Sequence, residues 1–177
     1  LASGVPFNGM FLYVLSAPEW LGTHLGLAPT QFWWFFLSSI AGIMAGAAVS
    51  GRLAGRWKPR RQIRWGFAIM LSCALLNVVL NATLAPHPAW ALVPVSVFAF
   101  GWALMVPVVT LMVLDLAPDR RGMASSLQAC VGSVANGIVA GVVAPLVMHS
   151  TLGLALASLA LLSVGLIAWA FVKRQPG

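Results

Sequence analysis

Long apolar segments, separated by short turns rich in proline, glycine and polar residues, run through the whole chain. A bilayer core of about 30 Å needs about 20 helical residues, so the pattern predicts an all-α, polytopic membrane protein with six transmembrane helices. These helices are expected at approximately residues 1–16, 30–53, 62–83, 89–116, 122–147 and 152–172. Pro18 should end the first helix, and Pro29 should begin the second. The chain starts at Leu1, without methionine and already in apolar sequence, and is therefore expected to be a fragment or a processed product.

The composition supports a membrane location and argues against a nucleic-acid partner. Of the 177 residues, 60% are hydrophobic and 7% are charged, whereas a soluble domain is about 25% charged. The formal net charge is +7. The basic residues stand at the ends of apolar segments and not along one amphipathic face, so they are expected to set membrane topology, and no nucleic-acid binding is predicted.

The basic residues gather in three places. Residues 51–64, which we call the basic segment, read GRLAGRWKPRRQIR and contain six of the ten basic residues. The others are Arg120 and Arg121, between the fourth and fifth predicted helices, and Lys173 and Arg174, after the sixth. With six crossings, all three places fall on one side of the membrane. By the positive-inside rule this side is the cytoplasm, and both termini are predicted to lie there.

The fifth predicted helix carries a polar face. Its members recur at steps of three and four residues and therefore share one side of the helix: Ser125, Gln128, Ala129, Gly132 and Asn136. Lipid would penalise the two amide side chains, so these must face protein or water. Two interpretations stay open: the amides bond neighbouring helices, or they line a wet cavity.

Other helices supply further candidates for a cavity wall. Asn8 is the strongly polar residue of the first helix, with Phe11 on its face, and the fourth helix carries a bulky stripe of Trp102, Met105 and Val109. Such stripes adapt to lipophilic ligands but also serve packing. The candidate substrate-cavity residues are Asn8, Phe11, Ser38, Trp102, Met105, Gln128 and Asn136. Asn77 and Asn81 need polar partners near the outer end of the third helix.

Small residues at four-residue spacing predict close helix packing. Gly42 and Gly46 form one such pair, and Gly137 and Gly141 form another. Membrane helices associate through such residues because apolar surface gains little by leaving lipid. The alternative is that they form bending elements, and Pro107 invites a kink in the fourth helix.

The acidic residues stand away from mid-membrane. Asp115 and Asp119 lie at the cytoplasmic end and Glu19 at the outer end. Since a proton relay usually needs a buried titratable group, no proton carrier is predicted in this chain. Asp115 is expected to pair with Arg56 or another loop arginine, or to stabilise the N-terminus of the fifth helix. Neither a G-x-S-x-G nor an H-E-x-x-H motif occurs, so neither enzymatic activity nor a catalytic, metal or cofactor site is predicted.

Two motifs resemble a known transporter family. The loop motif residues Gly51, Arg52, Gly55, Arg56, Lys58, Arg60 and Arg61 are similar to the G-x-L-a-D-R-x-G-R-[RK] loop of the major facilitator superfamily. Gly55 stands where that motif has an acid and Lys58 where it has its second glycine, as in the degraded copies of C-terminal halves. The segment from Leu114 and Asp115 through Pro118 into GMASSL at 122–127, with the opening residues 7–11 and 16–18 and the later 27–32, resembles the bicyclomycin/chloramphenicol-resistance branch of drug:proton antiporters.

The resemblance implies that this chain is the C-terminal half of a twelve-helix transporter with a substrate cavity between its halves. The expected function is proton-coupled export of drugs or a metabolite by alternating access, in a bacterial inner membrane. The expected partners are membrane lipid, the N-terminal six-helix half, a small lipophilic substrate and protons that reach it through that half. Two alternatives remain: a self-contained six-helix protein that dimerises as a small transporter or channel, and a nontransporting assembly subunit.

Overall fold

The chain folds into a bundle of long helices. The structure is a computed structural model that describes residues 3–174. The start of the first predicted helix at Leu1 and the charged side chains of Lys173 and Arg174 lie outside the described part. The helices, including the short 3-10 and π-helical segments (η), are α1 Gly4–Leu15, η1 Pro18–His24, η2 Pro29–Gln31, α2 Trp33–Leu53, α3 Pro59–Thr83, α4 Pro88–Asp115, η3 Pro118–Arg120, α5 Arg121–Ile138, η4 Val139–Val143, α6 Ala144–Val147 and α7 Thr151–Arg174. The all-α prediction is confirmed: residues 3–174 form no strand.

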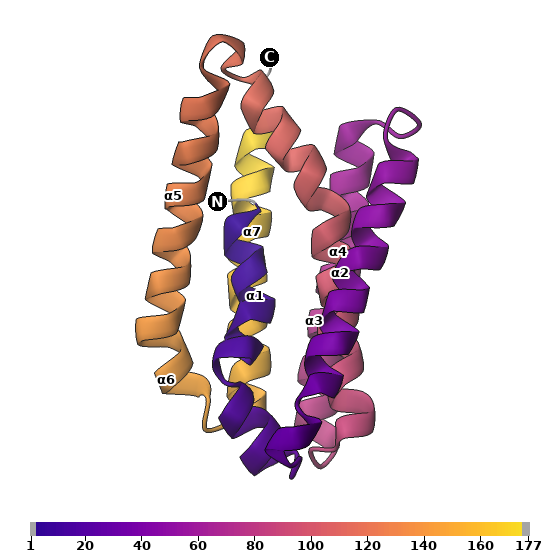
Figure 1. The fold of residues 1–177 in the computed structure, drawn as a ribbon, viewed down its shortest axis with the longest axis vertical. Coiled ribbons are helices and arrows are strands. Elements are labelled where there is room, and N and C mark those ends of the chain that lie inside the picture. Colours follow the sequence, from indigo (N-terminus) through magenta and orange to yellow (C-terminus); the bar gives the residue numbers. More distant parts are fainter. Residues whose placement is uncertain (1–2, 175–177) are drawn as a thin grey trace.

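Within residues 3–174, five helices are long and apolar enough to cross a membrane. They are Pro29–Leu53, Pro59–Thr83, Trp90–Asp115, Pro118–Val147 and Thr151–Phe171. The sixth predicted span, at the start of the chain, is represented by the shorter apolar helix Gly4–Leu15. Figure 1 shows that α1 begins near the middle of the bundle's height and runs toward one end.

The α1 helix ends at Leu15, close to the predicted end at residue 16, but Pro18 does not begin a loop. The chain continues as the π-helical η1, in which the Leu25 amide donates to the Trp20 carbonyl over 3.1 Å. Proline lacks an amide donor but is tolerated in a first turn. After Pro18, the backbone amides bond to carbonyls five residues earlier, as in a π-helix. The α3 helix begins at Pro59, earlier than predicted, since proline favours the first helical position. Arg60 and Arg61 therefore lie in its first turn.

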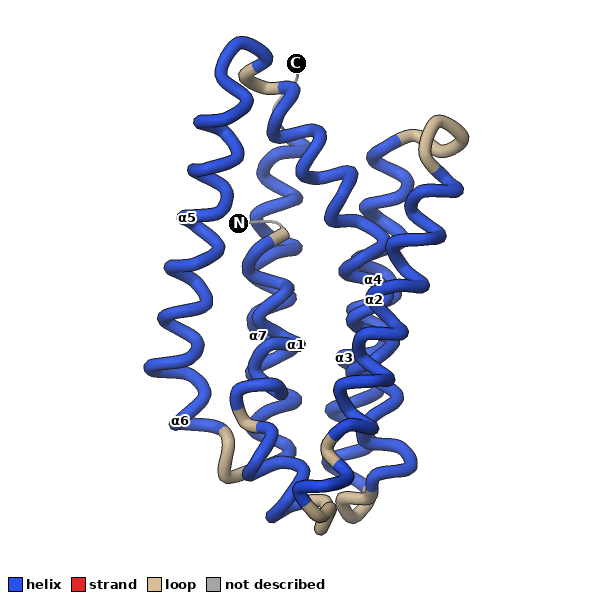
Figure 2. The backbone as a smooth tube through the Cα atoms, in the orientation of Figure 1, coloured by secondary structure: helices blue, strands red, loops and turns tan. Residues whose placement is uncertain are grey.

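The helices form two groups (Figures 1 and 2). The α4 helix packs extensively on α2 and α3, while α1 packs on α7, and α3 joins the groups through α7. The α5 helix stands at the edge and packs only lightly, mainly on α1 and α4. The α2–α3 turn, the α4–α5 turn and the end of α7 lie at one end of the bundle. These are the three places that carry the basic residues, as the six-helix topology requires.

Glycine permits the closest helix contacts. A Cβ atom at Gly42 would overlap the Ser96 carbonyl oxygen of α4, and one at Gly46 would overlap that of Phe100. The predicted close packing of this pair is therefore confirmed. The prediction was wrong for Gly137 and Gly141, since a Cβ there would meet nothing within 4 Å in the part of the chain that the structure describes.

A buried glutamine joins the three most tightly packed helices. Gln62 of α3 is 2% exposed, and its Nε2 atom donates to Ser50 Oγ of α2 over 2.7 Å and to the Leu104 carbonyl of α4 over 2.8 Å. Both bonds satisfy an amide that lipid would penalise. The role of Gln62 was not predictable from the sequence, because the residue stands among the arginines of the basic segment and resembles part of a polar turn.

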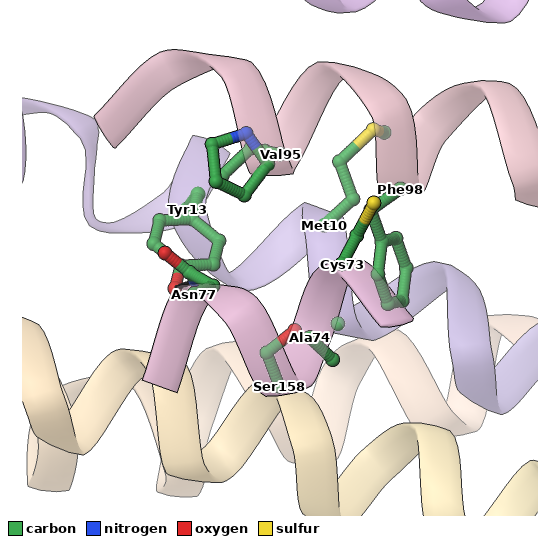
Figure 3. Close-up of a pocket in the computed structure, with 10 residues that line it drawn as sticks. Met10, Tyr13, Cys73, Ala74, Asn77, Val95, Phe98 and Ser158 are labelled. Carbon is green, nitrogen blue, oxygen red and sulfur yellow. Dashed lines mark hydrogen bonds between the residues drawn. The ribbon is translucent and has the colours of Figure 1, made fainter. Parts of the chain in front are cut away.

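The opposite end of the bundle is held by aromatic rings and an amide pair. The rings of Tyr13 and Phe35 meet Trp20 edge-on, at centroid distances of 4.6 and 5.3 Å. Asn77 donates to the Tyr13 hydroxyl over 2.6 Å, and Asn81 donates to Asn77 Oδ1 over 2.9 Å. The expected need of both asparagines for polar partners is thus met. Figure 3 shows Tyr13 and Asn77 side by side at a void of about 10 Å³, the lower limit for one water molecule.

Candidate binding cavity

A cavity of about 320 Å³ lies between α1, α4 and α5. Its volume falls within the range of small-molecule sites, about 300–1,000 Å³. The α1 side and the residue before it contribute Ser3, Gly4 and Phe7; α4 contributes Trp102, Val106 and Thr110; and α5 contributes Ser125, Gln128, Ala129, Gly132 and Asn136. None of these side chains is ionisable.

The α5 wall is the polar face described from the sequence. All five of its members line the cavity, and they alternate amides and a hydroxyl with small residues. No residue of α5, which is described in full, is buried. Apolar residues such as Leu127 and Val134 are exposed away from the cavity, at 64% and 57%. The helix therefore turns its polar side toward the neighbouring helices and the cavity between them, and its apolar side outward.

Gln128 is bonded at one end of its amide only. Its Nε2 atom donates to Thr110 Oγ1 over 3.1 Å and to Ser3 Oγ over 3.4 Å. Its Oε1 atom is buried and has no hydrogen-bond partner among the described residues. An unmet acceptor in a low-dielectric surrounding is costly.

Aromatic rings form the opposite wall. The Trp102 indole Nε1 donates to the Ser3 carbonyl over 3.0 Å, and the Phe7 ring lies 4.8 Å from the Trp102 ring at 44°. With its one donor engaged, Trp102 offers the cavity an apolar surface. The cavity thus has amides on the α5 side and ring surfaces on the α1 and α4 side.

The structure does not place the α1 candidates in this wall. Asn8 is fully buried, and its Nδ2 atom donates to the Gly4 carbonyl of its own helix over 3.1 Å. Phe11 stacks on Phe7 at 5.5 Å, behind the ring that lines the cavity. Neither side chain lines the cavity.

Two further candidates are also elsewhere. Met105 is fully buried in the α3–α4 contact, where its side chain closely approaches Gly66. Ser38 of α2 donates to the Phe35 carbonyl over 3.0 Å. Met105 therefore serves helix packing, and Ser38 forms a hydrogen bond within its own helix. Of the seven candidates, Trp102, Gln128 and Asn136 line the cavity.

Five lining residues were not identified from the sequence, namely Ser3, Gly4, Phe7, Val106 and Thr110. The spacing of these residues along the chain could have indicated some of them. Trp102, Val106 and Thr110 follow each other at four-residue steps, and so do Ser3 and Phe7, which places each set on one helix face. Thr110 is a polar residue on the same helix face as Trp102, and it could have been identified from this spacing.

The charged groups lie outside the cavity. Asp115 pairs with Arg121 over 3.3 Å, and both side chains are exposed. The expected partner Arg56 was therefore wrong, whereas the general expectation of a nearby arginine was right. An exposed pair of this kind contributes at most about 1 kcal/mol. It joins the last residue of α4 to the first of α5.

The basic segment forms a tight turn between α2 and α3. Gly55 has a φ of +76°, a left-handed conformation that glycine adopts without strain. This explains why glycine stands at the position of the motif's acid. After the turn, the Arg61 guanidinium lies over the Trp57 ring at 4.4 Å, a cation–π contact at the predicted membrane boundary.

Long apolar helices around an uncharged, partly polar cavity are typical of a membrane transport protein. The family model of the Major Facilitator Superfamily matches residues 1–177, and the chain belongs to that family. No curated protein and no solved structure matches it. The family consists of transporters and not enzymes, and the all-helical fold agrees with half of its architecture.

Proposed function

We propose that this chain is the C-terminal half of a secondary active transporter that exports small lipophilic drugs or a metabolite. Its partner is the N-terminal six-helix half of the same transporter, and the halves rock about a midplane site. The observation that carries the proposal is the cavity of about 320 Å³ walled by α1, α4 and α5. The motifs that resemble the bicyclomycin/chloramphenicol-resistance branch supply the choice of export and of proton coupling.

The proton is proposed to travel through the other half. None of the side chains lining the cavity is an acid or a histidine, and Asp115 is exposed at the end of α4. A carrier needs a titratable group at membrane depth.

Filling the cavity should stop export. A Cβ atom at Gly132 meets nothing within 4 Å, so Gly132→Trp in the full-length transporter should place its ring in the cavity without a backbone clash. We expect cells expressing it to accumulate lipophilic drugs as cells without the transporter do, at an unchanged level of membrane protein. Drug accumulation with and without a protonophore measures both export and its coupling.

Val134→Trp is the matched control, because Val134 lies outside the cavity lining and is 57% exposed. It should export normally. If Gly132→Trp exported drugs as well as the wild type, the cavity would have no part in export. If wild-type export did not respond to the protonophore, only the proposal of proton coupling would be refuted.

Membrane orientation is a separate prediction. The basic segment and both termini are proposed to face the cytoplasm of a bacterium, across its inner membrane. In a background without Cys73 and Cys130, Arg60→Cys should resist an impermeant thiol reagent in intact cells, and His87→Cys should react. Labelling of Arg60→Cys from outside, with His87→Cys protected, would reverse the topology.

A further inference from the structure

We infer that the outward face of α3 binds an anionic phospholipid, and that Arg60 and Arg64 hold the phosphate of its headgroup. This lipid site is separate from the cavity and does not depend on what the transporter carries. The basic segment contains six cations, and none of them forms an ion pair with any residue that the structure describes. Their charge is therefore available to a partner outside the chain.

The start of α3 carries charges that repel one another. Arg60 and Arg61 lie in its first turn, which contains no acid, although the N-terminus of a helix favours negative charge. Arg60 and Arg64 stand four residues apart, a spacing at which like charges are unfavourable. Arg61 lies over the Trp57 ring, whereas the side chains of Arg60 and Arg64 are exposed and have no partner among residues 3–174. An anion beside these two arginines would relieve the repulsion.

The two arginines belong to the face of α3 that points away from the protein. Successive residues of a helix are turned by about 100°. At this rotation, every exposed position from Arg60 to Val79 falls within about 160° of the helix circumference. Every buried position in the same range falls on the other side, and α3 packs there on α4 and α7. The arginines therefore continue directly into an outward-facing surface.

The chemistry along this surface follows the layers of a bilayer. Trp65 comes next to the arginines and is 51% exposed, and tryptophan is enriched at the level of the lipid headgroups. Leu75 and Val79 follow, 48% and 54% exposed. Leu75 lies about 16 Å from Arg64 along the helix axis, close to the roughly 15 Å of hydrocarbon in one leaflet. One phospholipid can thus place its headgroup on the arginines and its acyl chains on the apolar part.

The surrounding charge favours an anionic headgroup. Guanidinium groups bind phosphate through paired hydrogen bonds, and both phosphatidylglycerol and phosphatidylethanolamine offer a phosphate. The ethanolamine headgroup also carries an ammonium group, which the other four cations of the basic segment would repel. Asp115, at the same end of the bundle, is already paired with Arg121. Phosphatidylglycerol has no cationic group and keeps its net negative charge, so it fits this surface better.

Native mass spectrometry of the purified full-length transporter tests the lipid site. Titration with phosphatidylglycerol and with phosphatidylethanolamine of identical acyl chains gives an affinity for each, and we expect the wild type to prefer phosphatidylglycerol about fivefold or more. Arg60→Gln combined with Arg64→Gln should weaken phosphatidylglycerol binding about tenfold or more, because each cation near a lipid surface contributes about fivefold. Binding of phosphatidylethanolamine should change little. Arg60→Lys combined with Arg64→Lys keeps both charges and should keep most of the preference.

Arg120→Gln combined with Arg121→Gln is the matched control, since it removes two exposed cations from the same end of the bundle. This variant should keep the wild-type preference. An equal loss in the control would assign the preference to overall charge, and equal wild-type affinities for the two lipids would show no selection; either result would overturn the inference. Failure of the wild type to bind phosphatidylglycerol would show that another part of the transporter covers this face. Displacement of the lipid by excess inorganic phosphate would reveal a site for free anions, and this outcome would also refute the lipid site.

Discussion

Replacing both Gly42 and Gly46 by alanine is expected to remove a large part of the protein's stability. Each added Cβ atom would overlap a carbonyl oxygen of α4, at Ser96 and at Phe100. Backbone atoms cannot move aside as a flexible side chain can, so α2 must shift from α4. Overpacking of this kind costs typically about 1–3 kcal/mol at each site, against a total stability of about 5–15 kcal/mol. The monodisperse fraction after detergent extraction and the thermal unfolding midpoint measure the loss.

Gly51→Ala provides the control on the same helix. A Cβ atom at Gly51 meets nothing within 4 Å, and alanine has the higher helix propensity. This variant should be as stable as the wild type or slightly more so. If the Gly42 and Gly46 double variant unfolded at the wild-type temperature, the α2–α4 contact would not be the close one described.

Truncating Tyr13 should have the second large effect. The Tyr13 ring is 2% exposed, contacts Trp20 at 4.6 Å and bears the hydroxyl that accepts from Asn77. Tyr13→Ala would leave a cavity and an unpartnered amide. Losing a buried aromatic ring costs about 3–5 kcal/mol. The measurement is the thermal unfolding midpoint of the purified full-length transporter, and we expect a fall of several degrees.

Tyr13→Phe separates the ring from the hydroxyl. The aromatic packing on Trp20 remains, and only the bond to Asn77 is lost, which in a membrane costs about 0.6 kcal/mol on average and up to about 1.7. A midpoint for Tyr13→Phe as low as that for Tyr13→Ala would show that the hydrogen bond, and not the ring, holds this end of the bundle together.

Helix number and connectivity could be predicted because lipid imposes a strong rule. Apolar length decides which segments span, and the basic segment divides α2 from α3 without ambiguity. Helix ends were less predictable. The continuation of the first helix through Pro18 depends on a change to π-helical hydrogen bonds, and it is stabilised by the packing of Trp20 on Tyr13 and Phe35. Such long-range contacts leave no periodic signal in the local sequence.

The cavity was predictable on one side only. The α5 face could be read from its repeat because polar residues in an apolar helix stand out. The α1 and α4 walls consist mostly of apolar residues, where each side of the helix looks alike. The choice of Asn8 and Met105 in place of Phe7 and Val106 was therefore wrong by one residue, about 100° around the helix. Only the contacts with neighbouring helices fix that rotation.

The grouping of the basic residues at one end of the bundle has an electrical consequence. In the proposed orientation, the six cations of the basic segment lie at the negative side of the membrane potential. Moving one charge across 100 mV requires roughly 2.3 kcal/mol, so carrying all six across would require roughly 14 kcal/mol. The potential therefore holds the α2–α3 turn at the cytoplasmic surface throughout a transport cycle, and any rocking of the helices must pivot with this turn kept out of the electric field.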